Sequence, residues 1–367
     1  GANVVDAASY QGGRVSTLAD ALGYSPGVTV QPRFGAEEAR LSIRGSGAQR
    51  TFHGRGLKLM QDGVPLNLAD GSFDFQAVEP LTARYIEVWR GANAVQYGAG
   101  TLGGAVNFVS PNGYNSDGLA LRAEAGSFGY RRGLASTGGV NGGFDHYLSL
   151  SAFAQDGFRA HARQDTQRAF ANLGYALADD VETRFYVGAV KSRSELPGSL
   201  TWAQLQADPQ QANPGNMTND NRRDIDWLRL SNKTVLAQGS ERYELFVFAN
   251  AKKLFHPIFQ VLDQRNRDVG AELRFVSDAP VDGRKNRVVV GLAPGRGHTD
   301  EDRFANVGGQ RGARTNQSEQ DAKRLAFYVE NQHEVSPGWT LALGLQHLKT
   351  SRRLTDLFIA NTGTDTA

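Results

Sequence analysis

The first candidate site is a glycine-bounded loop with two arginines and a histidine. It contains Gln49, Arg50, Thr51, Phe52, His53, Gly54 and Arg55. Because a planar guanidinium binds a carboxylate through two parallel hydrogen bonds, this loop suits an anionic ligand. Asp70 to Phe73 form a second candidate loop, and Arg222-Arg223 is a weaker basic site. The candidate ligand-binding residues are Gln49, Arg50, Thr51, His53, Arg55, Asp70 and Phe73; a solvated surface loop is the alternative for each.

The motifs of common enzymes are absent or lack their structural context. Gly98, Gly100 and Gly103 satisfy G-x-G-x-x-G, but a dinucleotide site needs a helix that opens at the motif. Here a strand-like segment, 105–109, follows at once. Seven histidines are scattered without metal-ligand spacing, and there is no serine elbow or paired-carboxylate motif. We therefore expect no enzyme, no metal site and no cofactor.

Composition excludes several classes of protein. The chain has 367 residues, no cysteine and a net charge of +2, so disulfide scaffolds and thiol catalysis are excluded. The charge gives no reason to expect nucleic-acid binding. A hydrophobic content of 40% is too high for a disordered chain. No apolar run is long enough for a transmembrane helix, whereas a β-barrel wall hides its apolar residues in alternate positions.

Residues 1–112 have the pattern of a small mixed α/β unit. A helical turn is expected from Ser16 to Leu22, because a Ser or Thr cap precedes it and Gly23 follows it. Short apolar segments broken by Gly and Pro predict strands at 39–44, 57–61, 85–89 and 105–110.

From Leu119 onward the hydrophobic period becomes two, which is typical of half-buried strands. Leu148 and Leu150 alternate with Ser149 and Ser151, for example, and the pattern recurs at 119–125, 169–177, 185–191, 269–275, 325–330 and 339–346. The connections alternate between short turns, such as 141–143 and 336–338, and longer polar stretches at 156–166, 194–224, 254–266 and 298–320. Turns on one rim and loops on the other are typical of outer-membrane barrels, with a soluble β-fold as the alternative.

The strand count predicts an incomplete barrel. About 11 strands are expected here, whereas a barrel wide enough to hold a unit of about 110 residues needs about 22. Because lipid does not tolerate exposed sheet edges, we expect the chain to stop in mid-barrel, with 361–367 starting a loop. The predicted fold is a small α/β plug domain, 1–112, inside a transmembrane antiparallel β-barrel, 113–367, of which this chain holds the first half.

The order and spacing of five motifs in residues 1–110 resemble the plug domain of TonB-dependent outer-membrane receptors. These motifs contain Arg44, Gly45, Asp62, Gly63, Pro65, Glu87, Arg90, Gly91, Tyr97, Gly98, Gly103, Gly104 and Asn107. Among the subgroups, the chain looks closest to the ferric-citrate-receptor-like branch. The barrel strands resemble the family in their general pattern alone.

The resemblance implies active import of a scarce ligand, here a ferric siderophore or ferric-citrate-like chelate, across the bacterial outer membrane. It implies that TonB pulls on a segment before residue 1, that outer-membrane lipid surrounds the barrel, and that the loops 49–55 and 70–73 face the ligand. It also implies that Arg44 and Arg90 dock the plug onto glutamates of the barrel wall, in strands expected beyond this chain. A surface receptor for signalling, or for a phage or bacteriocin, is the alternative function.

Overall fold

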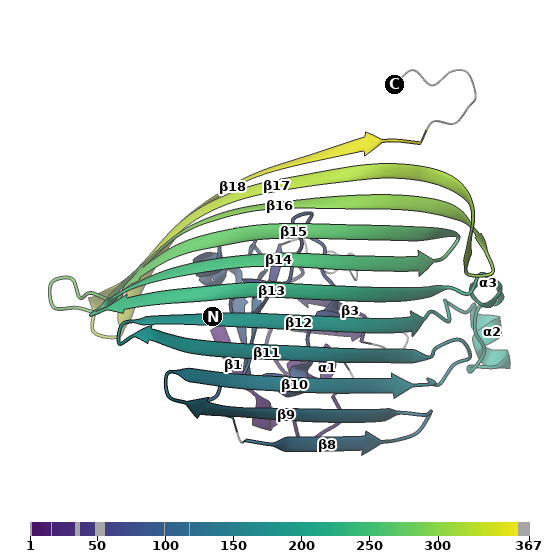
Figure 1. Ribbon diagram of the computed structural model, residues 1–367, viewed down its shortest axis with the longest axis horizontal. Helices are drawn as coiled ribbons and strands as arrows, with labels where there is room; N and C mark the ends of the chain where they lie inside the picture. Colours follow the sequence, from purple (N-terminus) through teal and green to yellow (C-terminus); the bar gives the residue numbers. More distant parts are fainter. Residues whose placement is uncertain are drawn as a thin grey trace.

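The computed structural model describes residues 2–15, 17–33, 37–47, 56–98, 100–116 and 118–358. The chain folds into two parts, a small N-terminal unit and a large curved sheet whose concave face holds that unit (Figure 1). We call the first part the plug and the second the wall. The last plug strand ends at Val109 and the first wall strand begins at Ala120, so the domain boundary predicted at 112 falls in the connection between them.

The plug combines a five-stranded sheet with a two-stranded hairpin. The sheet has the order β1-β6-β7-β4-β5, in which only β4 and β7 are parallel, and β2 pairs with β3. The strands are β1 (Ala2–Asp6), β2 (Val28–Pro32), β3 (Ala39–Ile43), β4 (Leu57–Gln61), β5 (Val64–Pro65), β6 (Tyr85–Arg90) and β7 (Gly104–Val109). The helices are α1 (Leu18–Leu22) and the 3-10 turns η1 (Ala7–Ser9), η2 (Phe75–Ala77), η3 (Pro80–Thr82) and η4 (Gly91–Tyr97).

The plug elements predicted from sequence are confirmed to within one or two residues. α1 begins after Thr17, whose hydroxyl and backbone form a capping box with Asp20. All four predicted strands are present as β3, β4, β6 and β7. The plug core lies around β4, whose residues are all buried, and it continues into the wall through Ile225 and Trp227.

The wall is a sheet of eleven strands in which every strand pairs antiparallel with the next one in the chain. The predicted number of strands is therefore confirmed. They are β8 (Ala120–Ala125), β9 (Arg131–Asn141), β10 (Phe144–Gln155), β11 (Gln164–Ala178), β12 (Val181–Glu195), β13 (Arg222–Gln238), β14 (Glu241–Pro257), β15 (Gln260–Ser277), β16 (Asn286–Val307), β17 (Gln310–Ser336) and β18 (Trp339–Asp356).

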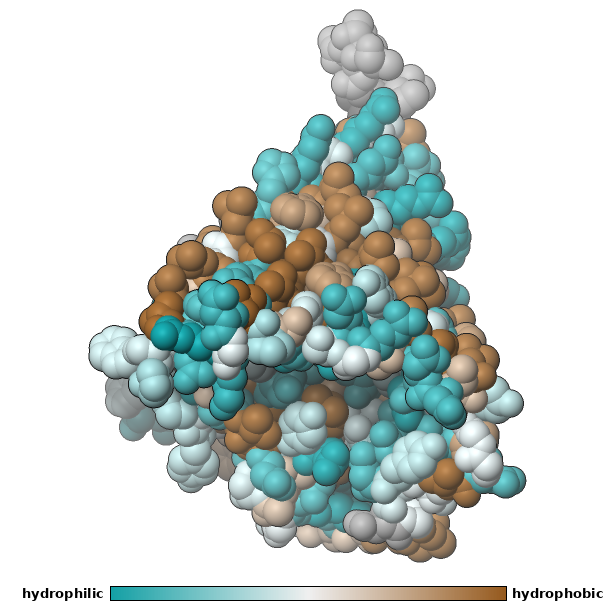
Figure 2. All heavy atoms as spheres, turned by 90° about the vertical axis from the view of Figure 1, so that its left-hand side faces the viewer, coloured by the Kyte–Doolittle hydropathy of each residue, from teal (hydrophilic) through white to brown (hydrophobic). Residues whose placement is uncertain are grey.

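The two faces of the wall differ in polarity. Along β10, Leu148 and Leu150 are exposed on the outer face, while Tyr147 and Ser149 are buried on the face toward the plug. Figure 2, which looks at the end with the short turns, shows hydrophobic side chains gathered on the flanks of the molecule. Among the described residues, no helix is long and apolar enough to cross a membrane.

The two rims of the wall carry different connections. One rim has short turns, among them 142–143, 179–180 and 337–338, and the other carries the connection 196–221 with α2 (Trp202–Ala207) and α3 (Pro214–Thr218) (Figure 1). The predicted rim asymmetry is thus present, but two predicted loops are wrong. Residues 254–266 and 298–320 form long β-hairpins with the two-residue turns 258–259 and 308–309.

The hairpins form because their backbone hydrogen bonds continue beyond the apolar band, where both faces of the sheet can be polar. Gly308 and Gly309 both have positive φ, as a type I′ hairpin turn requires, so this glycine pair was a sequence signal for the β16–β17 hairpin.

Gly104, the first residue of β7, tolerates no side chain. Its φ is +150°, and a Cβ atom there would lie 2.1 Å from the carbonyl oxygen of Trp89 in the neighbouring strand. Because β7 follows this segment directly, the structure also confirms that Gly98, Gly100 and Gly103 do not open a helix.

The substitution Gly104→Ala should destabilise the plug by about 2 kcal/mol, because it combines a strained backbone with a clash against the main chain. Hydrogen exchange in the complete protein should then be ~30-fold faster for the amides of β6 and β7. Gly12→Ala is the matched control, since nothing lies within 4 Å of its added Cβ. Equal exchange rates in the two variants would contradict the steric argument.

Candidate functional site

The plug is attached to the wall by buried ion pairs centred on Asp74. Its carboxylate lies 2.6 Å from Nη2 of Arg223 in β13 and also pairs with Lys252 of β14. All three side chains are buried. Burial by itself would raise the pKa of the Asp74 carboxyl, but Arg223 and Lys252 outweigh this effect and hold that pKa below its usual range.

Two further arginines of the wall hold the same part of the plug. Arg168 of β11 lies 2.5 Å from Glu37 and 3.3 Å from Glu79, and its Nε donates to the carbonyl of Gln76 at 2.8 Å. Arg229 of β13 donates to the Gln61 side chain at 2.5 Å and to the carbonyl of Ala77 at 3.2 Å. We call this set of contacts with β11, β13 and β14 the anchor.

The local sequence explains why the anchor forms at residues 74–79. Asp74 and Glu79 each precede a 3-10 turn, η2 and η3, and these two short turns leave backbone carbonyls free to accept hydrogen bonds from the wall. The period of two places Arg168 among the inward-facing residues of β11. The alternation is visible in the sequence but the anchor is not, because its cations lie on separate strands and come together only after the strands pair.

A second contact joins the plug to β15, β16 and β17. Nζ of Lys58 in β4 lies 3.7 Å from the carboxylate of Glu272 in β15 and donates to the carbonyl of Tyr97. The Tyr328 hydroxyl of β17 donates to the same carboxylate. The Tyr328 ring lies against Gly98, where an added Cβ would be 3.2 Å from the ring.

Cavities lie on both sides of this second contact. Toward the hairpin end, cavities of about 450 Å³ and 380 Å³ share Leu68, Asp70 and Arg352 in their linings. Toward the short turns, a cavity of about 690 Å³ is lined by Asp62, Glu87 and Tyr97 of the plug and by Lys233 and Arg274 of the wall. In Figure 2 hydrophilic side chains surround the hollow at this end.

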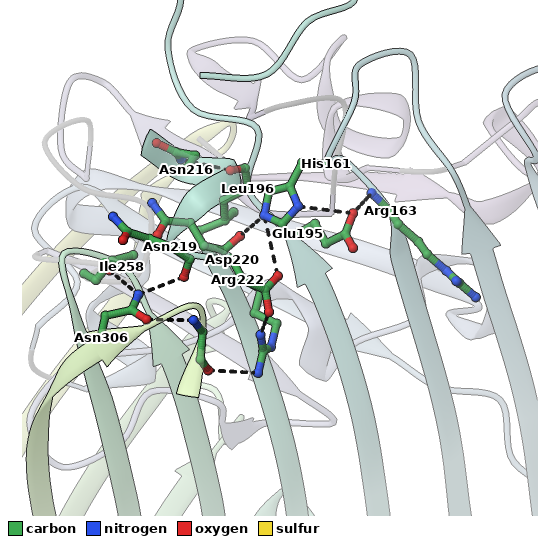
Figure 3. A network of polar contacts seen from close by, with 12 residues as sticks. His161, Arg163, Glu195, Leu196, Asn216, Asn219, Asp220, Arg222, Ile258 and Asn306 are labelled. Carbon is green, nitrogen blue, oxygen red and sulfur yellow. Dashed lines mark hydrogen bonds and ion pairs between the residues drawn. The ribbon is translucent and has the colours of Figure 1, made fainter. Parts of the chain in front are cut away.

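At the opposite end, a polar network ties four strand connections together (Figure 3). His161 lies 2.9 Å from the carbonyl of Asn221 and 3.9 Å from the Glu195 carboxylate. Asn306 donates to the carbonyls of Asn219, at 2.8 Å, and Ile258, at 2.5 Å. The connections 156–163, 196–221, 258–259 and 308–309 therefore form one assembly over this end of the wall.

The predicted ligand-binding residues have different outcomes. Asp70 lines two cavities, so its role stays a prediction with a suitable position. Phe73 is wrong as a ligand contact, because it is 2% exposed and packs edge-on against Phe75 in the plug core. The basic pair is also corrected, since Arg223 belongs to the anchor and Arg222 pairs with Asp220 and Asp224. Gln49, Arg50, Thr51, His53 and Arg55 lie outside the described residues.

The two arginines predicted to dock the plug differ in environment. Arg44 is exposed, with a positive φ at the turn after β3. Arg90 is buried, and its guanidinium donates to the carbonyl of Pro26 at 2.7 Å and to the side chain of Asn3. Their docking onto glutamates of the wall therefore stays a prediction. The described ion pairs that dock the plug use mainly carboxylates of the plug and cations of the wall.

The remaining motif residues shape the plug itself. Glu87 accepts hydrogen bonds from Asn107 at 2.9 Å and from Tyr97 at 3.2 Å, which joins β6, β7 and η4. Gly45, Gly63, Gly91 and Gly98 all have positive φ at turns, Pro65 ends β5, and Gly103 lies against Ser46, where a Cβ would come within 2.3 Å. Asp62 accepts from the backbone and hydroxyl of Ser110 at 2.8 and 3.0 Å.

One group of metal-type ligands comes together in the part of the chain that the structure describes. His298, Asp300 and Glu319 place one ligand atom each within 4.8 Å of one another on the β16–β17 hairpin. His298 already contacts Asp321 at 3.0 Å and Asp300 at 3.1 Å. The sequence does not reveal this group, because its members meet across a hairpin in a segment that was predicted to be a loop.

The substitution Asp74→Asn should weaken plug attachment by about 3 kcal/mol, because it leaves Arg223 and Lys252 buried without their carboxylate. We expect faster hydrogen exchange in residues 74–82 and easier proteolysis of the plug in the complete protein. Asp263→Asn is the control, since Asp263 pairs at 2.5 Å with the exposed Arg311. Exposed pairs contribute about 0–1 kcal/mol, so a larger effect at Asp263 would overturn this ranking.

The stability of the plug should depend on pH through Asp62. The pKa of this carboxyl is raised, whereas that of Asp74 is lowered. Burial raises the pKa of the Asp62 carboxyl to about 6, although the hydrogen bonds from Ser110 act against the shift. The charged form therefore costs stability above about pH 6, and this cost disappears below about pH 4. Asp62→Asn keeps the acceptor for Ser110 and tolerates the positive φ, so it should stabilise the plug by about 1–2 kcal/mol at pH 7.5.

Comparison of variant and wild type by hydrogen exchange at pH 7.5 and pH 4 tests this prediction. The gain should vanish at pH 4, and the same gain at both values would exclude titration of Asp62 as its cause.

Comparison with known proteins shows what the chain is similar to. Residues 1–105 match the family model of the TonB-dependent Receptor Plug Domain. The ferric-pyoverdine M114 receptor PbuA of Pseudomonas sp. (strain M114) is 34% identical over 94 residues, which cover 24% of this chain and 11% of that protein. The vitamin B12 transporter BtuB of Vibrio vulnificus (strain CMCP6) is 26% identical over 125 residues, covering 34% and 20%.

Solved structures share the fold over nearly the whole chain. The ferric citrate transporter FecA in the unliganded form superposes with a TM-score of 0.83 at 18% identity, over 97% of this chain and 57% of that one. The siderophore receptor PiuA from Acinetobacter baumannii gives 0.78 at 14% identity, over 99% and 59%. The chain therefore spans a little over half the length of these structures.

Proposed function

Because this chain belongs to the TonB-dependent receptor family of the bacterial outer membrane, we propose that the complete protein imports a scarce ligand, a ferric siderophore or ferric-citrate-like chelate. The observation that carries the proposal is the plug held against the concave face of the wall by buried ion pairs. A folded unit anchored in this way obstructs the lumen, so a solute passes only when the plug rearranges. The family consists of transporters and receptors, and we propose that this member has no enzymatic activity.

The proposed class of ligand is based on arginines that line the cavities and on the similarity of this chain to known receptors. Arg352 reaches the plug loop at Asp70, and Arg303 lines the cavity beside it. Together with Arg50 and Arg55, which the sequence predicts to face the ligand, these guanidiniums suit the carboxylates of an anionic chelate. The names of similar receptors, for ferric pyoverdine and ferric citrate, support the same class, and no described feature favours a purely signalling or phage-binding role.

The position of β1 supports energy transfer through a segment before residue 1. β1 is the edge strand of the plug sheet and pairs with β6 through five residue pairs, from Ala2–Trp89 to Asp6–Tyr85. Asn3 also accepts a hydrogen bond from Arg90. TonB pulling on the preceding segment would peel β1 from β6 one ladder bond at a time and release the bond between Asn3 and Arg90.

An uptake assay tests the function as a whole. A strain that lacks the gene should lose uptake and growth on one iron chelate, and the complete protein should restore both in a TonB-dependent way. Cobalamin, copper and sugar sources serve as parallel substrates. If uptake of every compound were unchanged and independent of TonB, the importer proposal would fail.

The double substitution Arg50→Ala/Arg55→Ala should weaken binding of an anionic ferric chelate by about tenfold or more, because two charge-assisted hydrogen-bond donors are lost. The dissociation constant measured on whole cells is the readout. Arg314→Ala, on the β16–β17 hairpin, serves as a control for loss of an exposed arginine. Unchanged affinity in the double variant would remove the 49–55 loop from the site.

A further inference from the structure

The plug meets the wall along two lines of very different strength. The anchor joins β11, β13 and β14 to the plug through Arg168, Arg223, Arg229 and Lys252, each with a carboxylate, amide or carbonyl partner. Along β15, β16 and β17, the described residues form one plug–wall ion pair, between Lys58 and Glu272. The plug is therefore held firmly on one side and weakly on the other.

The weak side has a compact centre, which we call the lock: Lys58, the Tyr97 carbonyl and Gly98 of the plug, with Glu272, Gly291 and Tyr328 of the wall. The Tyr328 ring lies over Gly291 in the adjacent strand, where an added Cβ would be 2.1 Å from the ring, and its other side meets Gly98. Glycine at both positions lets the ring fill the space between wall and plug.

The lock separates the cavities at the two ends of the lumen. Along β15, Asp268 lines the cavity toward the hairpins and Arg274 lines the cavity toward the short turns. Glu272 lies between these two residues in the strand. In β17, Ala326 lines the cavity of about 380 Å³ toward the hairpins, and the Tyr328 ring lies against Gly98, which lines the same cavity. The cavities on either side of the lock have volumes of about 380 and 690 Å³.

We propose that the imported ligand passes between the plug and strands β15–β17, and that opening of the lock admits it to the cavity toward the short turns. This inference rests on the proposed import function and adds the route and its gate. Opening this side breaks the ion pair between Lys58 and Glu272 and the hydrogen bond from the Ala69 backbone N–H to Asp268, at 2.6 Å, whereas opening the anchor would strand at least three buried charges.

Cations lie on both sides of the lock, among carboxylates such as Asp62, Glu87 and Glu244 in the cavity toward the short turns. Arg324 and Arg352 lie on the hairpin side of the lock, and Lys233 and Arg274 lie on the side of the short turns. Burial lowers the pKa of the Lys58 ammonium, and the ion pair with Glu272 acts against this shift. When the lock opens, Lys58 exchanges the Glu272 carboxylate for one of the ligand, so the cations form a path from one cavity to the other.

A reversible tether tests the route. The chain contains no cysteine, so the pair Lys58→Cys/Glu272→Cys can be linked by a short bis-methanethiosulfonate reagent across the lock. The matched control is Glu37→Cys/Thr166→Cys at the anchor, where the native side chains are 2.9 Å apart. Binding and energised uptake of radio-iron complexed with citrate, a hydroxamate and a catecholate are measured on cells that produce the complete protein.

We expect the lock tether to lower uptake of the transported complex at least tenfold, with unchanged binding and full recovery after reduction. The anchor tether should leave uptake within about twofold. Unchanged uptake with the lock tethered would overturn the proposal, as would equal inhibition by both tethers, which would mean that the whole plug leaves the wall. A wild-type protein that takes up none of the complexes would instead count against the proposed function.

A second measurement does not depend on the choice of ligand. The single variant Glu272→Cys should react faster with an impermeant maleimide in energised cells than in cells treated with a proton ionophore. Thr166→Cys, at the anchor, should react at the same rate in both. A rate at position 272 that does not change with energisation would refute the lock as the gate.

Discussion

The structure depends on the burial of charge between the plug and the wall. Asp74, Arg223 and Lys252 are all removed from water, and each such charge would be costly alone. Paired, they fix the plug in one position beside the apolar contact that Ile225 and Trp227 make with the plug core. A wholly apolar interface of the same size would hold the plug more firmly and would expose hydrophobic surface on release.

The period of two was enough to predict the wall, because a sheet with lipid on one face and polar groups on the other must alternate. Leu148 and Leu150 on one face, with Ser149 on the other, are determined by solvent alone. The hairpins at 254–266 and 298–320 were missed for the same reason. Beyond the apolar band both faces of the sheet are exposed to water, so the alternation of apolar and polar residues disappears although the backbone hydrogen bonds continue. A strand that is polar on both faces then has the composition of a loop.

The candidate site was harder to predict because it lies between segments far apart in the sequence. Asp74 and Arg223 are separated by 149 residues, and no local pattern links them. Phe73, placed in a ligand loop by its neighbours, is drawn into the plug core by its apolar area. Motif residues that are close in the plug make local contacts: Asn107 and Tyr97 both donate hydrogen bonds to Glu87, which joins β6, β7 and η4.

The motif glycines connect the fold to the proposed transport. Gly104 lets β7 approach β6 so closely that any side chain would strike the Trp89 carbonyl, which keeps the plug sheet intact under load. Gly98, only six residues earlier, faces the Tyr328 ring of the wall and holds it by contact without a bond. The same glycine-rich segment therefore joins a rigid side, within the plug sheet, to a weak side, toward the wall. A pull on the edge strand β1 reaches β6, its direct neighbour, and then η4 and Gly98, so the force arrives at the weaker of the two contacts between the described residues of plug and wall.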